Sequence, residues 1–561
     1  MERIFRIFSK EYGNINQAAL LLGSFAFLSQ ILGLFRDRFI AHFIGPSLLL
    51  DSYYAAFRIP DLIFISIASL ASITVIIPFV LSKMKGETLG EEAKKFLSDI
   101  FTVFLGVMVL VSVVVFFLMP YIAPIIAPGF APLLQEKVVL LSRIMLLSPI
   151  LLGLSNLFGA ITQLFRRFFI YALSPIFYNL GIIIGILFLY PTFGIEGLAL
   201  GVVLGALLHF LIQAFASASC GFTLRFSNKI NWAEIKRVIS VSLPRTLGLS
   251  FNNIALIVII SFASYLKGGS ISIFNLSLNL QSVPLGIIGL SYAVAAFPAL
   301  SRSFSVGKID EFKKHMTMTA RAIIFWSLPV TFLFIVLRAQ IVLVILGSGS
   351  FSWENTRLVA ASLAVFSISI MAQSLIGLFA RAYYASGNTR RPLIVNLLSS
   401  ISIVIFAFLF LFIFKYYPFF QYWIESILKV SDIAGTEVLM LPLAYSFGTI
   451  LNFTLLWFFI HKDFMPKEHF ILKTFLQSLS ASFFIGIVSY VCLNILSPVF
   501  GTTTFFGIFL QGFISGILGI MAGILVLRLL KNEELLELTK TLKTKFWKAK
   551  VIAPSQSEAG L

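Results

Sequence analysis

Runs of about 20 consecutive apolar residues recur along the whole chain, and they constrain its fold more than any other feature. Each run is long enough to cross the hydrocarbon core of a bilayer as a helix, since that core is about 30 Å thick. Backbone polar groups inside lipid must find partners within the protein, so only helices and closed barrels cross a membrane. The runs are too long for barrel strands and lack a two-residue alternation. The sequence therefore predicts an all-α membrane protein.

We predict about 14 transmembrane helices. Hydrophobic residues make up 59% of the chain and charged residues only 12%, about half the charged share of a soluble domain. The solvent that faces most of this surface is therefore lipid. The predicted spans cover residues 15–40, 48–82, 97–119, 137–164, 170–190, 197–219, 243–266, 271–301, 318–345, 357–380, 393–415, 438–460, 470–496 and 504–530.

The basic residues predict how the chain is oriented in its membrane. The sequence has 42 Lys and Arg against 24 Asp and Glu, a formal net charge of +18. If the N-terminus lies in the cytoplasm, roughly 31 of these 42 basic residues fall on the cytoplasmic side, as the positive-inside rule requires. Both termini are therefore predicted to be cytoplasmic. The basic excess also favours contact with anionic membrane lipids, and no soluble basic-aromatic module indicates nucleic acid as a partner.

No sequence pattern indicates catalysis. The two cysteines, Cys220 and Cys492, are far apart, and the five histidines are scattered. No phosphate-binding loop, metal-ligand spacing or nucleophile–base pair is visible. We therefore predict that the chain is not an enzyme and has no cofactor and no metal site.

An internal repeat predicts the architecture. Each half has a glycine, then an arginine pair, then a proline followed four residues later by an asparagine. Both copies would begin on the cytoplasmic side at an offset of about 220 residues, so the repeats are parallel, and transporters bind substrate where such repeats meet. The matching residues are Gly159, Arg166, Arg167, Pro175 and Asn179 in one half, and Gly377, Arg390, Arg391, Pro392 and Asn396 in the other.

The repeat divides the chain into predicted parts. Two lobes of about six helices each would enclose a central cavity, and two further helices would follow them. The segment between the lobes is amphipathic by composition, which is typical of a helix lying on a membrane surface. The predicted parts are an N-lobe at 1–219, a cytoplasmic linker at 220–242, a C-lobe at 243–460, the extra pair of helices at 461–530 and a cytoplasmic tail at 531–561.

Charged residues within spans are the candidate functional groups. A charge at membrane depth costs about 2.5–3.5 kcal/mol, so such residues face protein or water and usually serve function. The clearest group is Arg36, Asp37, Arg38, Asp51, Arg58 and Asp61, and Arg143, Arg245 and Glu196 are further candidates. A structural reading stays open for each, because Arg36 and Asp37 are also placed to form an ion pair at the end of the first span, and Arg58 is long enough to reach the interface.

Uncharged polar residues form a second candidate group. Gln30 and Asn279 lie within predicted spans, as do Asn252, Asn253, Asn275 and Gln281. Such amides usually form hydrogen bonds to neighbouring helices, and they also offer donors and acceptors to a polar substrate.

Several motifs resemble those of one transporter family. Gly33-x-x-Arg36-Asp37, with Ala41, Gly45 and Asp51 and then Ala56-Phe57-Arg58-x-Pro60, is similar to the N-terminal signature of the MurJ (MviN) lipid II flippases. Ala127-Pro128-Gly129-Phe130 and the segment from Tyr383 to Pro392 also resemble sequences of that family. The resemblance covers essentially the whole chain and places it in the multidrug/oligosaccharidyl-lipid/polysaccharide (MOP) flippase superfamily.

The resemblance implies a function and a site. It implies a flippase of the bacterial cytoplasmic (inner) membrane that moves a polyprenyl-pyrophosphate-linked saccharide, lipid II, across the bilayer by alternating access. Arg36 would then bind the pyrophosphate, Asp37 and Asp51 would support it, and Arg58 would assist. Arginine suits this role because its guanidinium forms charge-assisted, bidentate hydrogen bonds to phosphate oxygens.

The chain departs from the family at several cavity positions. Gln30, Phe64 and Asn279 stand where the family has arginines, and Ser69-Leu70-Ala71 replaces its Glu-Gly-Ala segment. Either other basic residues (Arg38, Arg58 or Arg245) take over, or the cargo differs. The alternatives are another MOP-type transporter, such as a polysaccharide-lipid flippase or an ion-coupled drug exporter, and a non-transporting membrane scaffold. The sequence leaves the coupling ion and the oligomeric state open.

Overall fold

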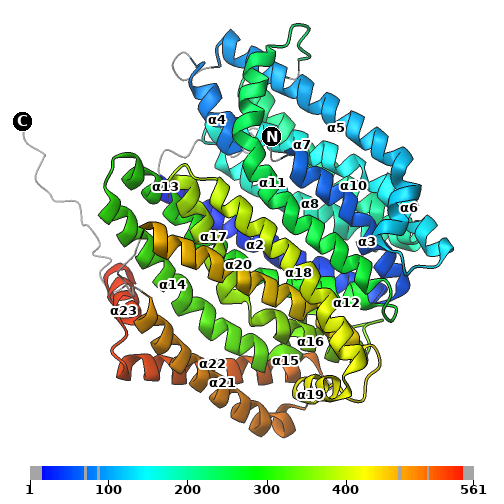
Figure 1. Ribbon diagram of the computed structural model, residues 1–561, viewed down its shortest axis with the longest axis vertical. Coiled ribbons are helices and arrows are strands. Elements are labelled where there is room, and N and C mark those ends of the chain that lie inside the picture. Colours follow the sequence, from blue (N-terminus) through cyan, green and yellow to red (C-terminus); the bar gives the residue numbers. More distant parts are fainter. Residues whose placement is uncertain are drawn as a thin grey trace, which may run out of the picture.

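The structure is a bundle of helices (Figure 1). The computed structural model describes residues 15–68, 73–84, 89–223, 225–464, 471–501 and 504–546, and leaves some further side chains out, among them those of 15–20 and Arg245. Every regular element within these ranges is helical. The predicted all-α membrane fold is therefore confirmed, whereas Ser69-Leu70-Ala71 lies outside the described residues.

Within the described ranges, eleven helices are long and apolar enough to cross a membrane. Helices α16 (Trp353–Ser367) and α17 (Ile370–Ala385), bent by 46° at their junction, form a twelfth span if they are counted together. The prediction of about 14 exceeds this count of described residues, and the difference lies in the first two predicted spans. They fall on α2 (Ile15–Phe43) and on the interrupted run α3 (Leu48–Ile63), η1 (Phe64–Ala68) and α4 (Ile73–Leu81). The first contains the charged residues 36–38, and the second includes residues 69–72, which lie outside the described part of the chain.

The helices that follow α4 pack on one another through close glycine contacts. A Cβ atom added to Gly181 of α8 would lie 2.3 Å from the Cα of Gly205 of α10. Small residues let helix backbones approach closely, which replaces the hydrophobic effect as a packing force in lipid. The elements are α5 (Glu91–Ile126), α6 (Pro132–Met145), α7 (Leu147–Leu164), α8 (Phe168–Ile184), η2 (Gly185–Leu189), α9 (Tyr190–Phe193) and α10 (Ile195–Ser219).

The helices of the second half pack around α17, α18 and α20. Helix α18 lies between α11 and α20, and α14 lies along α13 and α17. The elements are α11 (Trp232–Ala263), α12 (Ser270–Pro284), η3 (Leu285–Leu290), α13 (Ser291–Ser305), α14 (Ile309–Val336), α15 (Arg338–Leu346), α16, α17, α18 (Arg390–Tyr416), α19 (Pro418–Leu428), η4 (Thr436–Leu439) and α20 (Met440–Phe464).

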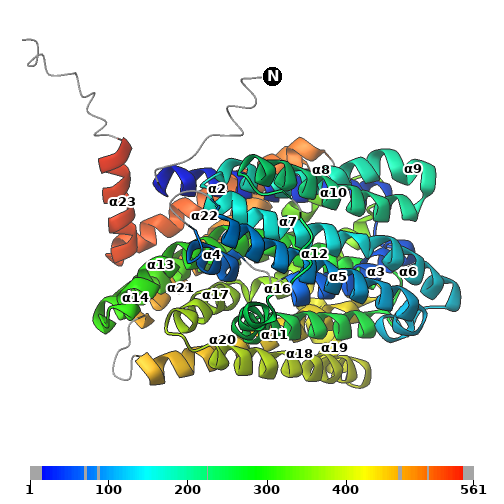
Figure 2. The ribbon, with the colours of Figure 1, turned by 90° about the horizontal axis from the view of Figure 1, so that it is seen from above.

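The last two long helices form a pair at the edge of the bundle. Helices α21 (Leu472–Phe500) and α22 (Phe505–Leu529) pack on each other and on α14 and α15 (Figure 1). The final helix, α23 (Glu533–Phe546), projects away from the bundle (Figure 2). Glu533 anchors its first turn through ion pairs of 2.7 Å to Lys473 and 3.3 Å to Arg321.

The predicted linker does not end where the next span begins. Helix α11 starts at Trp232 and continues unbroken to Ala263, so the predicted boundary at residue 242 falls inside one helix. Ile235 and Val238 are buried, and Glu234 forms a 2.6 Å ion pair with Lys83. The linker region is thus packed against α4 and α5, and the division into two repeated lobes stays a prediction.

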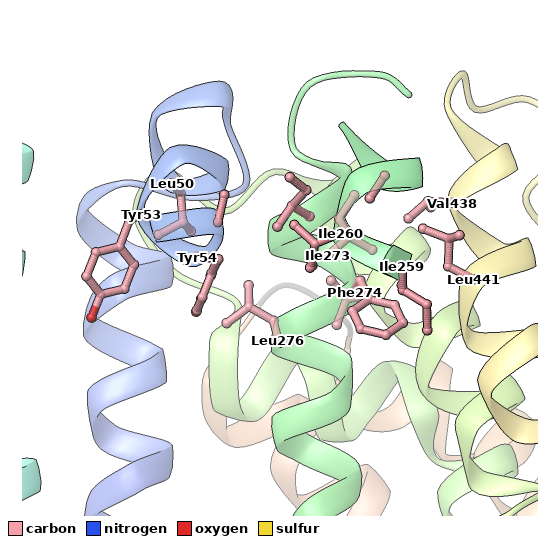
Figure 3. Close-up of a cluster of buried hydrophobic side chains, with 14 of the residues drawn as sticks. Leu50, Tyr53, Tyr54, Ile259, Ile260, Ile273, Phe274, Leu276, Val438 and Leu441 are labelled. Atoms are coloured by element: carbon pink, nitrogen blue, oxygen red, sulfur yellow. The ribbon is translucent and has the colours of Figure 1, made fainter. Parts of the chain in front are cut away.

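A large apolar cluster joins helices from both halves of the chain. Leu50, Tyr53 and Tyr54 of α3 belong to this cluster, and Tyr54 faces α12 whereas the ring of Tyr53 points away from it (Figure 3). Tyr54 and Leu276 lie opposite each other in this view. Further along, α3 and α12 each pass into a π-helical segment, η1 or η3, close to Pro60 and Pro284. π-Helical turns often mark functional sites in long helices.

Candidate functional site

A polar cavity of about 290 Å³ lies between α2, α3, α8 and α12. It contains the charged residues that the sequence analysis picked out near the end of α2 and in α3. Aromatic rings form much of the remaining wall. The lining residues are Arg36, Asp37, Ile40, Tyr53, Tyr54, Phe57, Arg58, Asp61, Tyr178, Ile182, Asn275, Leu278 and Asn279.

One side of the cavity holds a closed ion pair. Arg36 Nε donates to Asp37 Oδ1 over 2.9 Å, and the Nη2–Oδ1 distance is 2.8 Å. Arg36 also donates to Asn179 Oδ1 over 3.3 Å, and Asn279 Nδ2 donates to Asp37 Oδ2 over 3.1 Å. The pair is therefore held by α8 on one side and by α12 on the other, which fixes the guanidinium at the cavity wall.

The other side of the cavity has an incompletely paired arginine. Arg58 Nη2 donates a short hydrogen bond to Asn275 Oδ1 of α12. Its Nε is buried and, among the described residues, has no hydrogen-bond partner. Asp61 lies one helical turn further along α3 and also lines the cavity. Arg58 and Asp61 both line the cavity, but no ion pair joins them within the part of the chain that the structure describes.

Helix periodicity explains why these residues share a cavity. Asn275 and Asn279 are four residues apart, so they lie on one face of α12. Arg58 and Asp61, at three residues apart, likewise share a face of α3. The cavity thus receives all four of its formal charges from α2 and α3, and two arginines balance two aspartates.

Asp51 has a different place. It is 2% exposed and accepts three hydrogen bonds at the start of α12, from Gly269 N and Ser272 N at 2.7 Å each and from Ser272 Oγ at 2.6 Å. The free N–H groups at a helix N-terminus favour a carboxylate in this position. Asp51 therefore caps α12 rather than lining the cavity.

Further contacts join the two halves near Asp51, and we call this region the sealed end. Ser350 N donates to His42 O over 2.9 Å, and Gly129 N donates to Ser264 Oγ over 3.0 Å. Arg38 Nη1 donates to Val344 O over 2.6 Å. The contacts are tight, because a Cβ added to Gly349 would lie 2.3 Å from His42 O. The sealed end closes the bundle on one side of the cavity.

The structure brings several of the sequence candidates together and separates others. The candidates that line the cavity are Arg36, Asp37, Arg58, Asp61, Asn275 and Asn279. Gln30 does not, since its Nε2 lies against η3, 2.9 Å from where a Cβ on Gly286 would be. Asp51 caps α12 at the sealed end. Arg38, one of the basic residues considered as replacements, contacts α15 instead.

The sequence analysis missed several cavity residues. Tyr53, Tyr54 and Tyr178 were not among its candidates, and Asp61 was named among the charged residues but not as a substrate-binding residue, although all four line the cavity. The spacing of Asp61 from Arg58 was a usable signal, because both must lie on one face of a helix. Tyrosine carried no such signal, since tyrosine is enriched at both membrane–water interfaces whether or not it binds a substrate.

Comparison with known proteins identifies the family. The model of the family described as "Lipid II flippase MurJ" matches residues 40–511. The chain is 28% identical over 401 residues to a protein of Buchnera aphidicola named "Probable lipid II flippase MurJ", covering 69% of this chain and 76% of that one. It is 25% identical over 397 residues to the "Lipid II flippase MurJ" of Burkholderia cenocepacia, covering 68% and 75%.

Solved structures agree on the fold. A structure titled "Lipid II flippase MurJ, inward closed conformation" superposes with a TM-score of 0.70 at 23% identity, covering 93% of this chain and 100% of that one. An inward-facing MATE family transporter of the MOP superfamily gives a TM-score of 0.62 at 15% identity, covering 80% and 98%. Since the family model spans most of the sequence, this chain belongs to the lipid II flippase MurJ family.

Proposed function

We propose that this protein translocates lipid II, a polyprenyl-pyrophosphate-linked saccharide, across the bacterial cytoplasmic membrane. The observation that carries the proposal is a charged, hydrogen-bonding cavity between α2, α3, α8 and α12, in a chain whose family is named for this activity. A guanidinium inside a membrane bundle is costly unless its charge and N–H groups are compensated, and Arg58 keeps one buried N–H group without a partner among the described residues. The polar lining also counts against a non-transporting scaffold.

The proposed cycle uses alternating access. The pyrophosphate enters the cavity from the cytoplasm and accepts hydrogen bonds from Arg36 and Arg58, which form strong contacts to phosphate oxygens. The sealed end faces the outside, which agrees with cytoplasmic termini and with the positive-inside rule. Opening the sealed end while the opposite side closes then exposes the headgroup to the outer leaflet. Transport of this kind makes and breaks no covalent bond, so we assign no catalytic residue.

The test is translocation in proteoliposomes. The purified full-length chain is reconstituted with lipid II that carries a fluorophore on its peptide, and a membrane-impermeant quencher reports the leaflet. We expect the quenchable fraction to change with time only in vesicles that contain the protein. Equal rates in protein-free vesicles and in vesicles with well-folded protein would refute the proposal.

A second candidate is export of a cationic small molecule by the same cavity. The presence of Asp37 and Asp61, which cancel the two arginine charges, favours it over a purely anionic cargo. The same vesicles distinguish the two candidates when they are loaded with ethidium under an ion gradient. Ethidium movement without lipid II movement would establish the exporter, and the reverse result would exclude it.

A further inference from the structure

We propose that Asp61 is the protein ligand of a divalent cation that enters the cavity together with the pyrophosphate. This inference rests on the proposed function, and it names a cofactor for the same site. Three observations lead to it: the charge balance of the cavity, the free carboxylate of Asp61 and the geometry of α3.

The cavity has too little positive charge for a pyrophosphate. A pyrophosphate diester carries two negative charges, but the lining residues sum to zero, because Arg36 and Arg58 face Asp37 and Asp61. Arg36 is already neutralised by Asp37 at 2.8 Å. Arg58 is then the one cavity cation that, within the described part of the chain, lacks an ion-pair partner. A doubly charged ligand in a low-dielectric cavity needs more compensation than one guanidinium supplies.

Asp61 is available to bind a cation. Among the residues that the structure describes, no side chain or backbone group lies within hydrogen-bonding or ion-pair distance of its carboxylate. This distinguishes it from Asp37, which is held by Arg36 and Asn279, and from Asp51, which accepts three hydrogen bonds. A carboxylate inside a membrane bundle without such partners is a candidate ligand for a cation.

The chemistry of magnesium matches this arrangement. Mg²⁺ keeps several of its waters and is commonly bound by one or two carboxylates together with substrate phosphates, rather than by an all-protein cage. One carboxylate beside a phosphate site is therefore sufficient. A cavity of about 290 Å³ has room for a pyrophosphate and several waters.

The geometry of α3 places the cation beside the phosphate. Arg58 and Asp61 are one turn apart on the same helical face, so a phosphate oxygen held by Arg58 lies close to a cation held by Asp61. The guanidinium would then contact one phosphate, while the cation would bridge the pyrophosphate and the carboxylate. With the cation bound, the carboxylate of Asp61 would no longer repel the pyrophosphate and would be part of its binding site.

The experiment measures binding of lipid II to the full-length protein in detergent, with magnesium chloride or with excess EDTA. We expect wild-type affinity to fall about tenfold in EDTA, the usual size of one charge-assisted contact. Asp61→Asn should bind equally in both conditions, near the wild-type value in EDTA. Asp61→Glu should retain part of the magnesium dependence, because it keeps a carboxylate.

A matched control removes one carboxylate elsewhere. Asp310→Asn changes the net charge by the same amount at a fully exposed residue that pairs only with Lys313 at 3.6 Å, within the part of the chain described. It should keep the magnesium dependence of the wild type. Elution volume and thermal unfolding check that each variant is folded.

A second measurement needs no variant. Electron paramagnetic resonance counts Mn²⁺ bound to the wild-type protein, and we expect one additional tightly bound Mn²⁺ per protein only when lipid II is present.

Equal wild-type affinity in Mg²⁺ and EDTA, or no additional Mn²⁺, overturns the inference and leaves the proposed function standing. The inference is also overturned if Asp61→Asn weakens binding by the same factor, relative to the wild type, in magnesium and in EDTA. Asp61 would then contact lipid II without a cation. Absence of any lipid II binding by the wild type refutes the proposed function and this inference together.

Discussion

The carboxylates at the two ends of α3 have different surroundings. Asp51, in the first turn, accepts hydrogen bonds from two backbone N–H groups and one hydroxyl, and it is almost fully buried at the sealed end. Asp61, in the last turn, faces the cavity, where none of the described residues binds it. The same residue type in one helix therefore serves closure of the bundle in one place and faces an open cavity in the other.

This difference suggests a general way to interpret charged residues within membrane spans. A charge whose hydrogen-bonding capacity is used by the protein is structural, since its burial is already compensated. A charge or donor that keeps unused capacity inside a cavity is the better candidate for ligand binding. By this criterion Asp51 has a structural role, whereas Arg58 and Asp61 are candidates for binding the ligand. Substitutions at each kind of position test the distinction.

The largest effect is expected for Asp51→Ala. The change leaves the N–H groups of Gly269 and Ser272 buried without a partner, so we expect the free energy of unfolding to fall by about 4 kcal/mol. Thermal unfolding in detergent, followed by tryptophan fluorescence, measures the change. Lipid II affinity of the protein that remains folded should be unaltered. A stable variant with weakened lipid II binding would instead move Asp51 into the site.

Gly349→Ala is expected to weaken the sealed end by about 3 kcal/mol. Gly349 has a φ of +60°, and its new Cβ would also lie 2.3 Å from His42 O. Gly307→Ala is the matched control, because Gly307 has a φ of +78° but a Cβ added there would meet no atom within 4 Å. It should cost only the backbone strain, about 1 kcal/mol. Equal unfolding temperatures for the two variants would contradict tight packing at the sealed end.

Arg36→Ala tests the cavity. Removing its charge-assisted contacts to the pyrophosphate should lower the rate of lipid II translocation by about 10- to 100-fold, while stability changes little by comparison with Asp51→Ala. The proteoliposome assay measures the rate. Arg143→Ala is a suitable control, because Arg143 lies outside the cavity and donates to Phe116 O. Undiminished transport by Arg36→Ala would remove Arg36 from the proposed mechanism.

Asn279→Arg gives the smallest expected change and sharpens the comparison most. It restores an arginine at a position where the family resemblance expects one, opposite Asp37. The added charge should raise lipid II affinity in EDTA about tenfold and reduce the effect of Mg²⁺. Binding titrations in both conditions measure this. An unchanged magnesium dependence would show that the charge balance of the cavity does not control cation binding.

Much of the fold followed from the sequence because lipid restricts what a chain can do. Long apolar runs had to be helices, and eleven or twelve of them meet the requirements for a span in the described residues. Helix ends and breaks were less predictable. Helix α11 continues through the predicted end of the linker, and α16 and α17 bend within one predicted span, because packing between helices decides where a helix bends or ends.

The candidate site was predictable only in part. Charges within spans pointed correctly to a polar centre, so Arg36, Asp37, Arg58 and Asn279 were found. Gln30 and Asp51 satisfied the same criterion but face η3 and the start of α12. A polar residue in a span must face protein or water, yet this rule does not say which neighbour it meets.

The sequence by itself determined that this protein is a multi-pass helical membrane protein with a few buried charges, because the cost of exposing backbone or charge to lipid leaves no other solution. Only the tertiary structure decided which of those charges have hydrogen-bond partners within the protein. The rotation and pairing of α3 against α12 give Asp51 three donors and leave Asp61 in the cavity, since hydrogen-bond partners far apart in the sequence meet only when the helices pack.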